Sequence, residues 1–322
     1  TESAIMAYRQ GRQVEAIQLF ERAAEQANSA EAWCNLGSAL CDYGQYKSAY
    51  DALLKAQRLD EKLALVWFSL ARAAKGLGRF TESLEHIQQA IALDANDLDF
   101  RFFRAESAVE YDQWDVTLKD LAILAGQHLS PPQRLKLANL YLQTGQFSAA
   151  MPHYQTLVTQ FPAYFEAWMG LAAASERAND LPQFERSLQH AAGAARNPEQ
   201  ATALKQMQAK SAFRNKQFDE SAKLLQDVWM LPSDNGLSKN QVGFEHAQSL
   251  DKSKQFQTAW HVLNDAHSLR NGLNKGSAGD DQALRFFELL AEPLSGAWPA
   301  AYQETDQLDP VFVVGFPRSG TT

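Results

Sequence analysis

The sequence predicts an all-helical solenoid, an array of stacked helix pairs. The first reason is a pattern of aromatic residues, leucine, glycine and alanine that returns about every 34 residues through most of the 322-residue chain. The second is that small residues recur where two helices would have to approach closely, and the third is a glycine between the two halves of several repeats. A single helix pair of this kind cannot bury its apolar face alone, so its stability comes from stacking on its neighbours.

The repeat is strong in the second, third and fifth units, the sixth follows the same pattern, and a first unit lacks its opening. The second unit reads Trp33, Leu36, Gly37, Gly44, Ala49 and Ala56; the third reads Trp67, Leu70, Ala71, Gly78, Ser83 and Ala90; the fifth reads Leu137, Ala138, Tyr141, Gly145, Ala150, Tyr154 and Pro162; and the sixth reads Trp168, Leu171, Ala172 and Ala191. The fourth, seventh and eighth units keep the frame but only part of the pattern.

Each residue type has a physical role in such a unit. Small residues such as Gly37 and Ala49 allow close helix approach, and large ones such as Trp33 and Tyr154 fill the gaps between pairs. A glycine after the first helix can adopt the left-handed conformation that ends it, which is predicted for Gly11, Gly44, Gly78 and Gly145. In the fourth unit Asp112 replaces that glycine and Thr117 replaces the small alanine, which leaves the geometry of this hairpin open.

The repeat resembles the tetratricopeptide repeat (TPR). We count about eight units, the first truncated, over residues 1–272. The resemblance implies a right-handed superhelix whose first helices line a concave groove. A protein or peptide ligand, or the chain's own catalytic domain, would bind there. Candidate groove residues are Phe68, Arg72, Phe102, Met169, Arg177, Lys210, Arg214 and Phe244. The alternative is that the apolar members of this set pack against the next helix.

Composition limits the class of protein. The net charge of −8 and the pI of about 5.4 argue against a surface that coats nucleic acid. No apolar run approaches the 18–20 residues that a membrane span needs, and no secretory signal is visible, so a cytoplasmic protein is expected. Cys34 and Cys41 would lie about 10 Å apart along one helix, too far for a disulfide. No metal site is expected, because the common ligand spacings do not occur.

Residues 273–308 are expected to connect the solenoid to a further element. The segment opens with glycine, asparagine and serine residues that indicate a loop. Asp280 or Asp281 would then cap a helix from Asp281 to about Glu292 with Leu284, Phe287 and Leu290 on its apolar side. This helix would lead into the last segment, cap the solenoid, or do both.

The last residues, 309–322, carry the strongest indication of chemistry. The apolar run from Val311 to Val314 follows an Asp-Pro turn signal and predicts a buried strand. It leads into a loop from Gly315 to Gly320, where backbone N–H groups could converge on a phosphate. The lysine of nucleotide-hydrolysing loops is absent, and Arg318 is the only cation in the loop.

The string Pro-Arg-Ser-Gly-Thr-Thr after an apolar strand resembles the 5′-phosphosulfate-binding loop of sulfotransferases. These enzymes transfer a sulfonate from 3′-phosphoadenosine 5′-phosphosulfate (PAPS) to an acceptor hydroxyl or amine. The resemblance implies that Arg318 is catalytic, contacting the phosphosulfate and neutralising the leaving charge. It also implies a cofactor-binding set of Pro317, Arg318, Ser319, Gly320, Thr321 and Thr322. No metal is needed in this mechanism.

The resulting interpretation is the amino-terminal part of a TPR-containing sulfotransferase. Its groove would recruit the acceptor, which could be a protein tyrosine, or a partner protein. The chain alone is expected to be inactive, because the catalytic base and the 3′-phosphate site are not in its sequence. One alternative is a non-catalytic TPR adaptor for protein–protein interaction. Another is a kinase or NTPase with a phosphate-binding loop fused to the repeats. No nucleic-acid or membrane partner is expected.

Overall fold

The computed structural model describes residues 2–232 and 236–273, and these fold into sixteen helices without a strand. The helices form consecutive antiparallel pairs joined by short turns. The pairs are α1 (Glu2–Arg9) with α2 (Gln13–Ala27), α3 (Ala30–Asp42) with α4 (Tyr46–Leu59), α5 (Ala64–Gly76) with α6 (Phe80–Leu93), α7 (Leu98–Glu110) with α8 (Trp114–Ala125), α9 (Pro131–Gln143) with α10 (Phe147–Gln160), α11 (Phe165–Arg177) with α12 (Leu181–Ala194), α13 (Pro198–Arg214) with α14 (Phe218–Trp229), and α15 (Gly236–Lys252) with α16 (Phe256–Leu273).

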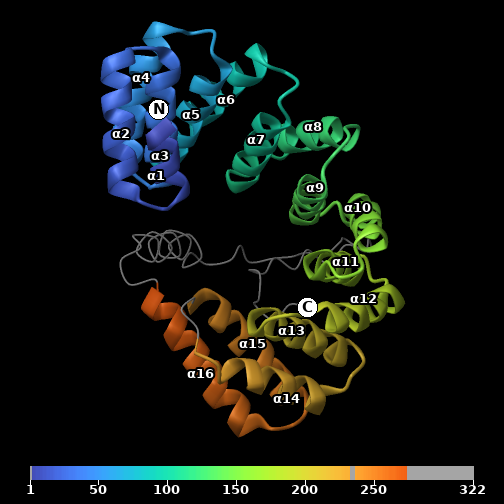
Figure 1. Ribbon diagram of the computed structural model, residues 1–322. Helices are drawn as coiled ribbons and strands as arrows, with labels where there is room; N and C mark the ends of the chain where they lie inside the picture. The colour runs from blue at the N-terminus through green and yellow to red at the C-terminus, as the bar shows by residue number, and fades with distance from the viewer. Residues whose placement is uncertain (1, 233–235, 274–322) are drawn as a thin grey trace, which may run out of the picture.

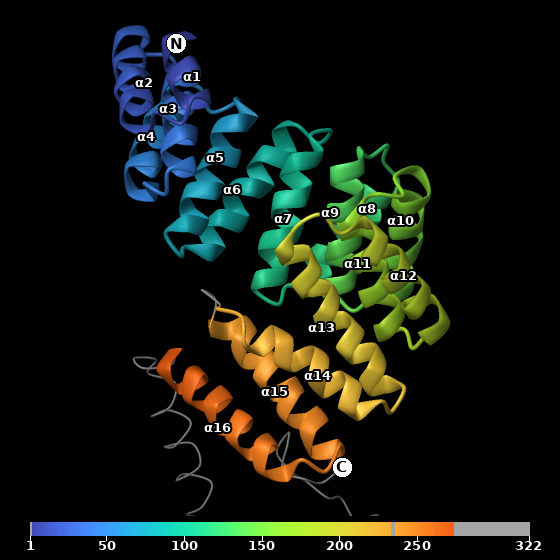
Figure 2. The ribbon, with the colours of Figure 1, turned by 60° about the horizontal axis from the view of Figure 1, so that its bottom comes forward.

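The pairs stack into an open arc, which confirms the predicted helical solenoid. In Figure 1, α7, α9, α11 and α13 lie on the inner side of the arc, and α8, α10, α12 and α14 lie on the outer side. Turning the molecule shows the pairs following one another as a staggered series that ends at α15 and α16 (Figure 2). The strand and loop predicted from the sequence for residues 309–322 lie outside the described residues, as does most of the predicted connecting segment before them.

The turn inside each pair has the same backbone conformation in all eight pairs. The second residue of this turn has a positive φ in every pair, between 55° and 74°. Glycine occupies this place in the first, second, third and fifth pairs, as the sequence predicts. The non-glycine residues there are Asp112, Asn179, Lys216 and Lys254. The hairpin of the fourth pair therefore forms with Asp112 in the left-handed region.

A hydroxyl group can replace the small alanine at the start of the second helix without disrupting the pair. The Ser83 hydroxyl donates to the Ala71 carbonyl at 2.7 Å, and the Ser221 hydroxyl donates to the Ala209 carbonyl at 2.9 Å. Thr117, which stands at this place in the fourth pair, donates to the Ala105 carbonyl at 3.4 Å. Each hydroxyl is buried and satisfied by a first-helix carbonyl, so the hairpin keeps its close packing.

Close helix approach depends on small residues facing large ones. A Cβ atom on Gly37 would lie 2.4 Å from the Leu53 side chain, and one on Gly170 would lie 2.2 Å from the Tyr154 ring. Tyr154 is fully buried, and its hydroxyl donates to the Asn139 side chain at 2.6 Å. The apolar core is divided into clusters that include residues from neighbouring pairs, such as Tyr154 of α10 with Leu171 of α11.

Both cysteines are buried and free. Cys34 and Cys41 face the next pair, where each sulfur lies 3.9 Å from an oxygen of Ser69. Burial raises the pKa of the Cys41 thiol to about 11. The predicted absence of a disulfide between them therefore holds, and neither thiol has the character of a nucleophile.

Replacing a lysine in the left-handed turn should stabilise the protein. A side chain with a Cβ is strained at positive φ, so Lys216→Gly should raise the free energy of unfolding by about 1 kcal/mol. The matched control is Lys223→Gly, inside α14, where glycine should lower it by about 1 kcal/mol. Urea unfolding followed by circular dichroism measures both. Destabilisation by Lys216→Gly would contradict the assigned turn.

Candidate functional site

The predicted groove residues come from first helices, but they do not share one environment. Phe68, Met169 and Phe244 are half-buried, whereas Phe102 has no exposed surface. Phe102 packs into a core cluster with Leu121 and Leu124 of α8 and Leu137 of α9. The placement of Phe102 on the groove surface is therefore wrong, because α8 of its own pair and α9 of the next pair together cover it completely.

Phe68 lies within an aromatic cluster at the junction of α5 and α7. Its ring centroid is 5.0 Å from that of Phe100 and 5.4 Å from that of Phe103, the latter in an edge-to-face arrangement. The Arg72 guanidinium lies 5.9 Å from the centroid of Phe68 and also pairs with Asp42. Both candidates on α5 are thus held by contacts to α3 and α7, with part of each side chain still accessible.

Ion pairs join the first helices of successive pairs along the array. Lys75 of α5 contacts Glu110 of α7 at 2.8 Å, and Lys136 of α9 contacts Glu106 of α7 at 2.9 Å. A cavity of about 360 Å³ opens between these three helices, with both ion pairs among its lining residues. These two ion pairs join α5 to α7 and α7 to α9 on the inner side of the array.

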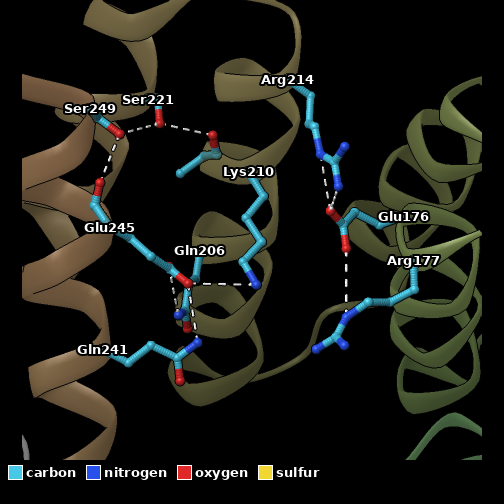
Figure 3. Close-up of polar contacts among 10 residues, drawn as sticks. Glu176, Arg177, Gln206, Lys210, Arg214, Ser221, Gln241, Glu245 and Ser249 are labelled. Carbon is cyan, nitrogen blue, oxygen red and sulfur yellow. Dashed lines mark hydrogen bonds and ion pairs between the residues drawn. The ribbon is translucent and has the colours of Figure 1, made fainter. Parts of the chain in front are cut away.

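The second group of candidates surrounds a smaller cavity of about 190 Å³ between α11, α13 and α15. Apolar atoms come from Ala209, Phe213 and Leu225, and the charged groups are Glu176, Lys210, Arg214 and Glu245. Figure 3 shows how these charged side chains extend from three different first helices toward one another. The structure thus brings together Lys210 and Arg214, two of the predicted groove residues, from one helix.

Glu176 holds one side of this cavity. The Arg214 guanidinium donates to one Glu176 oxygen, from Nε at 3.1 Å and also from its terminal nitrogen. Arg177 reaches the second Glu176 oxygen at 3.9 Å (Figure 3). The Glu176 side chain is only 13% exposed, whereas that of Arg214 is 44% exposed. The carboxylate is therefore mostly enclosed, and the arginine keeps donors that face solvent.

Glu245 of α15 holds the other side. Its carboxylate accepts from the amides of Gln206 and Gln241, each at 3.1 Å, and lies 3.6 Å from the Lys210 ammonium. The base of the cavity is buried and polar. The Ser221 and Ser249 hydroxyls lie 2.9 Å apart, and Ser249 donates to the Glu245 carbonyl. These contacts fix the positions of the first helices of three successive pairs.

Met169 and Phe244 do not line this cavity. Met169 packs at the edge of a core cluster that contains Phe184 and Leu204. The Phe244 ring stands edge-to-face against His267 of α16, with 5.0 Å between centroids. The predicted PAPS-binding set and the catalytic Arg318 lie outside the described residues.

Sequence reasoning missed the buried acid of the fourth pair. The Asp120 side chain of α8 has no exposed surface, and Arg104 of α7 binds both of its oxygens at 2.7 Å. Arg101, one turn earlier, adds a contact at 3.4 Å. In the sequence, the only indication of a buried acidic partner was that Arg101 and Arg104, three residues apart, fall on one face of α7. This ion pair joins two helices of one pair and is structural.

The described parts of the chain contain neither a cluster of metal ligands nor a helix that could span a membrane. Histidine, cysteine, aspartate and glutamate residues there form no group of three that could hold a metal ion. Among the described helices, none has the length and apolar character needed to cross a membrane.

Comparison with known sequences supports the repeat assignment. The tetratricopeptide repeat family matches residues 30–63, 64–97 and 135–201. The first two ranges coincide with the pairs α3–α4 and α5–α6. The chain contains tetratricopeptide repeats. A TPR repeat-containing protein of Methanocaldococcus jannaschii, MJ1428, is 24% identical over 140 residues, which is 43% of this chain but only 23% of that protein.

Solved structures agree on the fold. A tetratricopeptide repeat protein from Parabacteroides merdae is similar over 77% of this chain and 96% of its own, with a TM-score of 0.55 and 13% identity. The C-terminal part of a TPR repeat-containing protein from Cytophaga hutchinsonii is similar over 73% of this chain and 96% of its own, with a TM-score of 0.56 and 13% identity. PilF from Pseudomonas aeruginosa is similar over 66% of this chain and 95% of its own, with a TM-score of 0.52 and 14% identity. At these identities the likeness shows the TPR fold alone.

Removing the buried acid of α8 should be costly. Asp120→Ala leaves Arg101 and Arg104 without their counter-charge, so it should lower the free energy of unfolding by about 3–5 kcal/mol. Asp115→Ala is the control, an exposed acid in the first turn of the same helix, with an expected loss below about 1 kcal/mol. Chemical denaturation of both variants provides the comparison, and equal losses would show that Asp120 has no special role.

Proposed function

We propose that the TPR array is a protein-interaction module that binds a peptide segment of a partner between α11, α13 and α15. The observation that carries this proposal is the cavity of about 190 Å³, in which an apolar wall and a polar serine base are bordered by acidic and basic groups. An apolar pocket with a few fixed polar groups is the usual form of a recognition site.

The size of the cavity favours a side chain over a free small molecule. Pockets that enclose small molecules commonly measure about 300–1,000 Å³. This cavity is smaller and is lined by successive first helices, so it suits one or two side chains of a chain lying across them. The apolar contact would come from Phe213 and Leu225, and the backbone of the peptide would meet the charged border.

The charged border can bind a ligand without losing its own pairs. An ammonium has three donors and a guanidinium has five, and each of Lys210 and Arg214 uses only some of them on Glu245 and Glu176. Their side chains are 35% and 44% exposed. The remaining donors can reach the carbonyl or carboxylate oxygens of a peptide, and the existing pairs hold the side chains in place beforehand.

Selection from a randomised dodecapeptide library on the whole chain provides a probe. For a selected peptide, Lys210→Ala should weaken binding about tenfold, the loss expected when a charged hydrogen-bond donor is removed. Lys205→Ala is the matched control, because this lysine lies on the same helix and pairs with Asp227 at 2.8 Å, outside the cavity. Isothermal titration calorimetry measures both affinities.

The result that would contradict the proposal is equal affinity of the Lys210→Ala, Lys205→Ala and unaltered chains. A selection that yields no binding peptide from the library would also count against it. Circular dichroism of each variant establishes that the helices remain folded.

We further propose PAPS-dependent sulfonate transfer as a second activity of the protein to which these repeats belong. One feature favours it, the apolar run Val311–Val314 followed by the Pro317-Arg318-Ser319-Gly320-Thr321-Thr322 string. Arg318 would bind the phosphosulfate group of PAPS, and the groove would hold a protein acceptor of the sulfonate. The adaptor function does not depend on this second proposal.

Nucleotide binding by the full-length protein tests the second activity. The protein should bind 3′-phosphoadenosine 5′-phosphate in preference to ATP, and Arg318→Ala should slow sulfonate transfer on the order of 100-fold. Ser319→Ala should slow it less, since the serine backbone donor remains. Equal binding of the two nucleotides, or an unchanged rate for Arg318→Ala, would rule the activity out.

A further inference from the structure

A second recess lies on the other side of α13 from the cavity described above. It measures about 650 Å³ and is lined by residues of α12, α13 and α14. From α13 come Gln208, Ser211 and Asn215. With a helical repeat of about 3.6 residues, they fall on nearly the opposite side of the helix from Lys210 and Arg214. We call this recess the outer groove, because α12 and α14 lie on the outer side of the arc (Figure 1).

One end of the outer groove has a small residue where another pair has an aromatic ring. Asn215 directly follows α13, and the residue that directly follows α7 is Tyr111. The Tyr111 ring stacks on that of Phe80, the first residue of α6, with 3.8 Å between centroids. Asn215 has no ring, and its amide donates to Glu185 of α12 at 2.7 Å. This end of the groove is therefore open, and a tyrosine in place of Asn215 would occupy it.

Side-chain amides make up much of the wall. Gln189 of α12, Gln208 of α13 and Gln217 at the start of α14 all line the groove. Gln189 and Gln217 are exposed, and Gln208 is half-buried. A primary amide has an acceptor and two donors, so it can bond both the N–H and the C=O of a peptide. An extended main chain offers these groups, whereas a helix bonds most of them internally. The wall therefore suits an extended segment.

The floor of the groove is apolar, and its charge is acidic. Leu188 and Ala212 lie at the bottom, each 5% exposed. Among the described residues that line the groove, only Glu185 and Glu220 are charged, and both are exposed. Lys216 lines the neighbouring recess rather than this one. A segment with basic side chains complements this distribution of charge.

We propose that the outer groove binds an extended segment of a partner protein that contains lysine or arginine. The three glutamine amides would bond its main chain, and Glu185 and Glu220 would pair with a basic side chain. The lining residues of α12, 185–192, extend over about 10 Å, the length of about three extended residues. The groove would thus recognise a short motif. It is a different surface from the cavity between α11, α13 and α15, so either proposal can fail without the other.

Differential selection from a randomised dodecapeptide library tests the proposal. The library is first depleted of peptides that bind the Asn215→Tyr chain and is then selected on the whole unaltered chain. The tyrosine should occupy the end of the groove, as Tyr111 stacks on Phe80 in the fourth pair. The selected peptides should be rich in lysine or arginine. Lys210→Ala should leave their affinity unchanged, because Lys210 does not line the outer groove.

A matched pair of charge reversals then locates the basic side chain of a selected peptide. Glu220→Lys should weaken binding about tenfold, since it places like charges together. Asp219→Lys makes the same change of charge at the preceding exposed residue, which does not line the groove, and should leave the affinity unchanged. Gln208→Ala should weaken binding about fivefold through the lost amide. Isothermal titration calorimetry measures the affinities, and circular dichroism shows that each variant is folded.

Four results would overturn the proposal. If no peptide distinguishes the unaltered chain from the Asn215→Tyr chain, the groove is not a binding site. Selected peptides poor in lysine and arginine would mean that it binds a different chemistry. Equal weakening by Glu220→Lys and Asp219→Lys would reduce the binding to a general effect of charge. A dimer of the unaltered chain, seen by light scattering and lost in the Asn215→Tyr chain, would assign the groove to a second copy.

Discussion

Each helix pair leaves an apolar face that only the next pair can cover, and this requirement governs the whole molecule. Tyr154 of α10 is fully buried because α11 packs over it, and Gly170 of α11 provides the necessary space. The same requirement buries Tyr50 of α4 against α6, and Ala222 of α14 against α15 and α16. It also sets the spacing of the first helices, whose side chains then meet across the inner side of the arc.

The inner side is therefore an arrangement of charged groups positioned by packing behind it. Glu176, Arg214, Lys210 and Glu245 come from three helices, and their contacts exist because the core clusters beneath hold those helices at fixed separations. The resulting cavity combines a buried polar base with an apolar wall and partly exposed cations. A peptide that binds here meets groups that are already oriented, which lowers the entropic cost of association.

The sequence was sufficient for the fold because repeat spacing and turn chemistry are local properties. Gly11 and Gly145 adopt the left-handed conformation that their places in the repeat predict. Lys216 and Lys254 adopt it as well, although their residue type gives no such indication, because the register of the pair imposes it.

The burial of individual side chains was harder to predict than the turns. Phe68 and Phe102 occupy equivalent places, yet only Phe102 is fully covered, because the neighbouring side chains decide how much surface remains. Glu245 escaped notice because its partners, Lys210 and Gln206, are 35 and 39 residues away in sequence.

Photo-crosslinking of a selected peptide tests most directly whether the cavity between α11, α13 and α15 is the binding site. p-Benzoylphenylalanine would replace Gln248, which lines the cavity, or Gln226, an exposed residue of α14 that does not line it. Crosslinking from position 248 and none from position 226 is the predicted result. Equal crosslinking from both positions, or crosslinking from position 226 alone, would show that the peptide binds elsewhere.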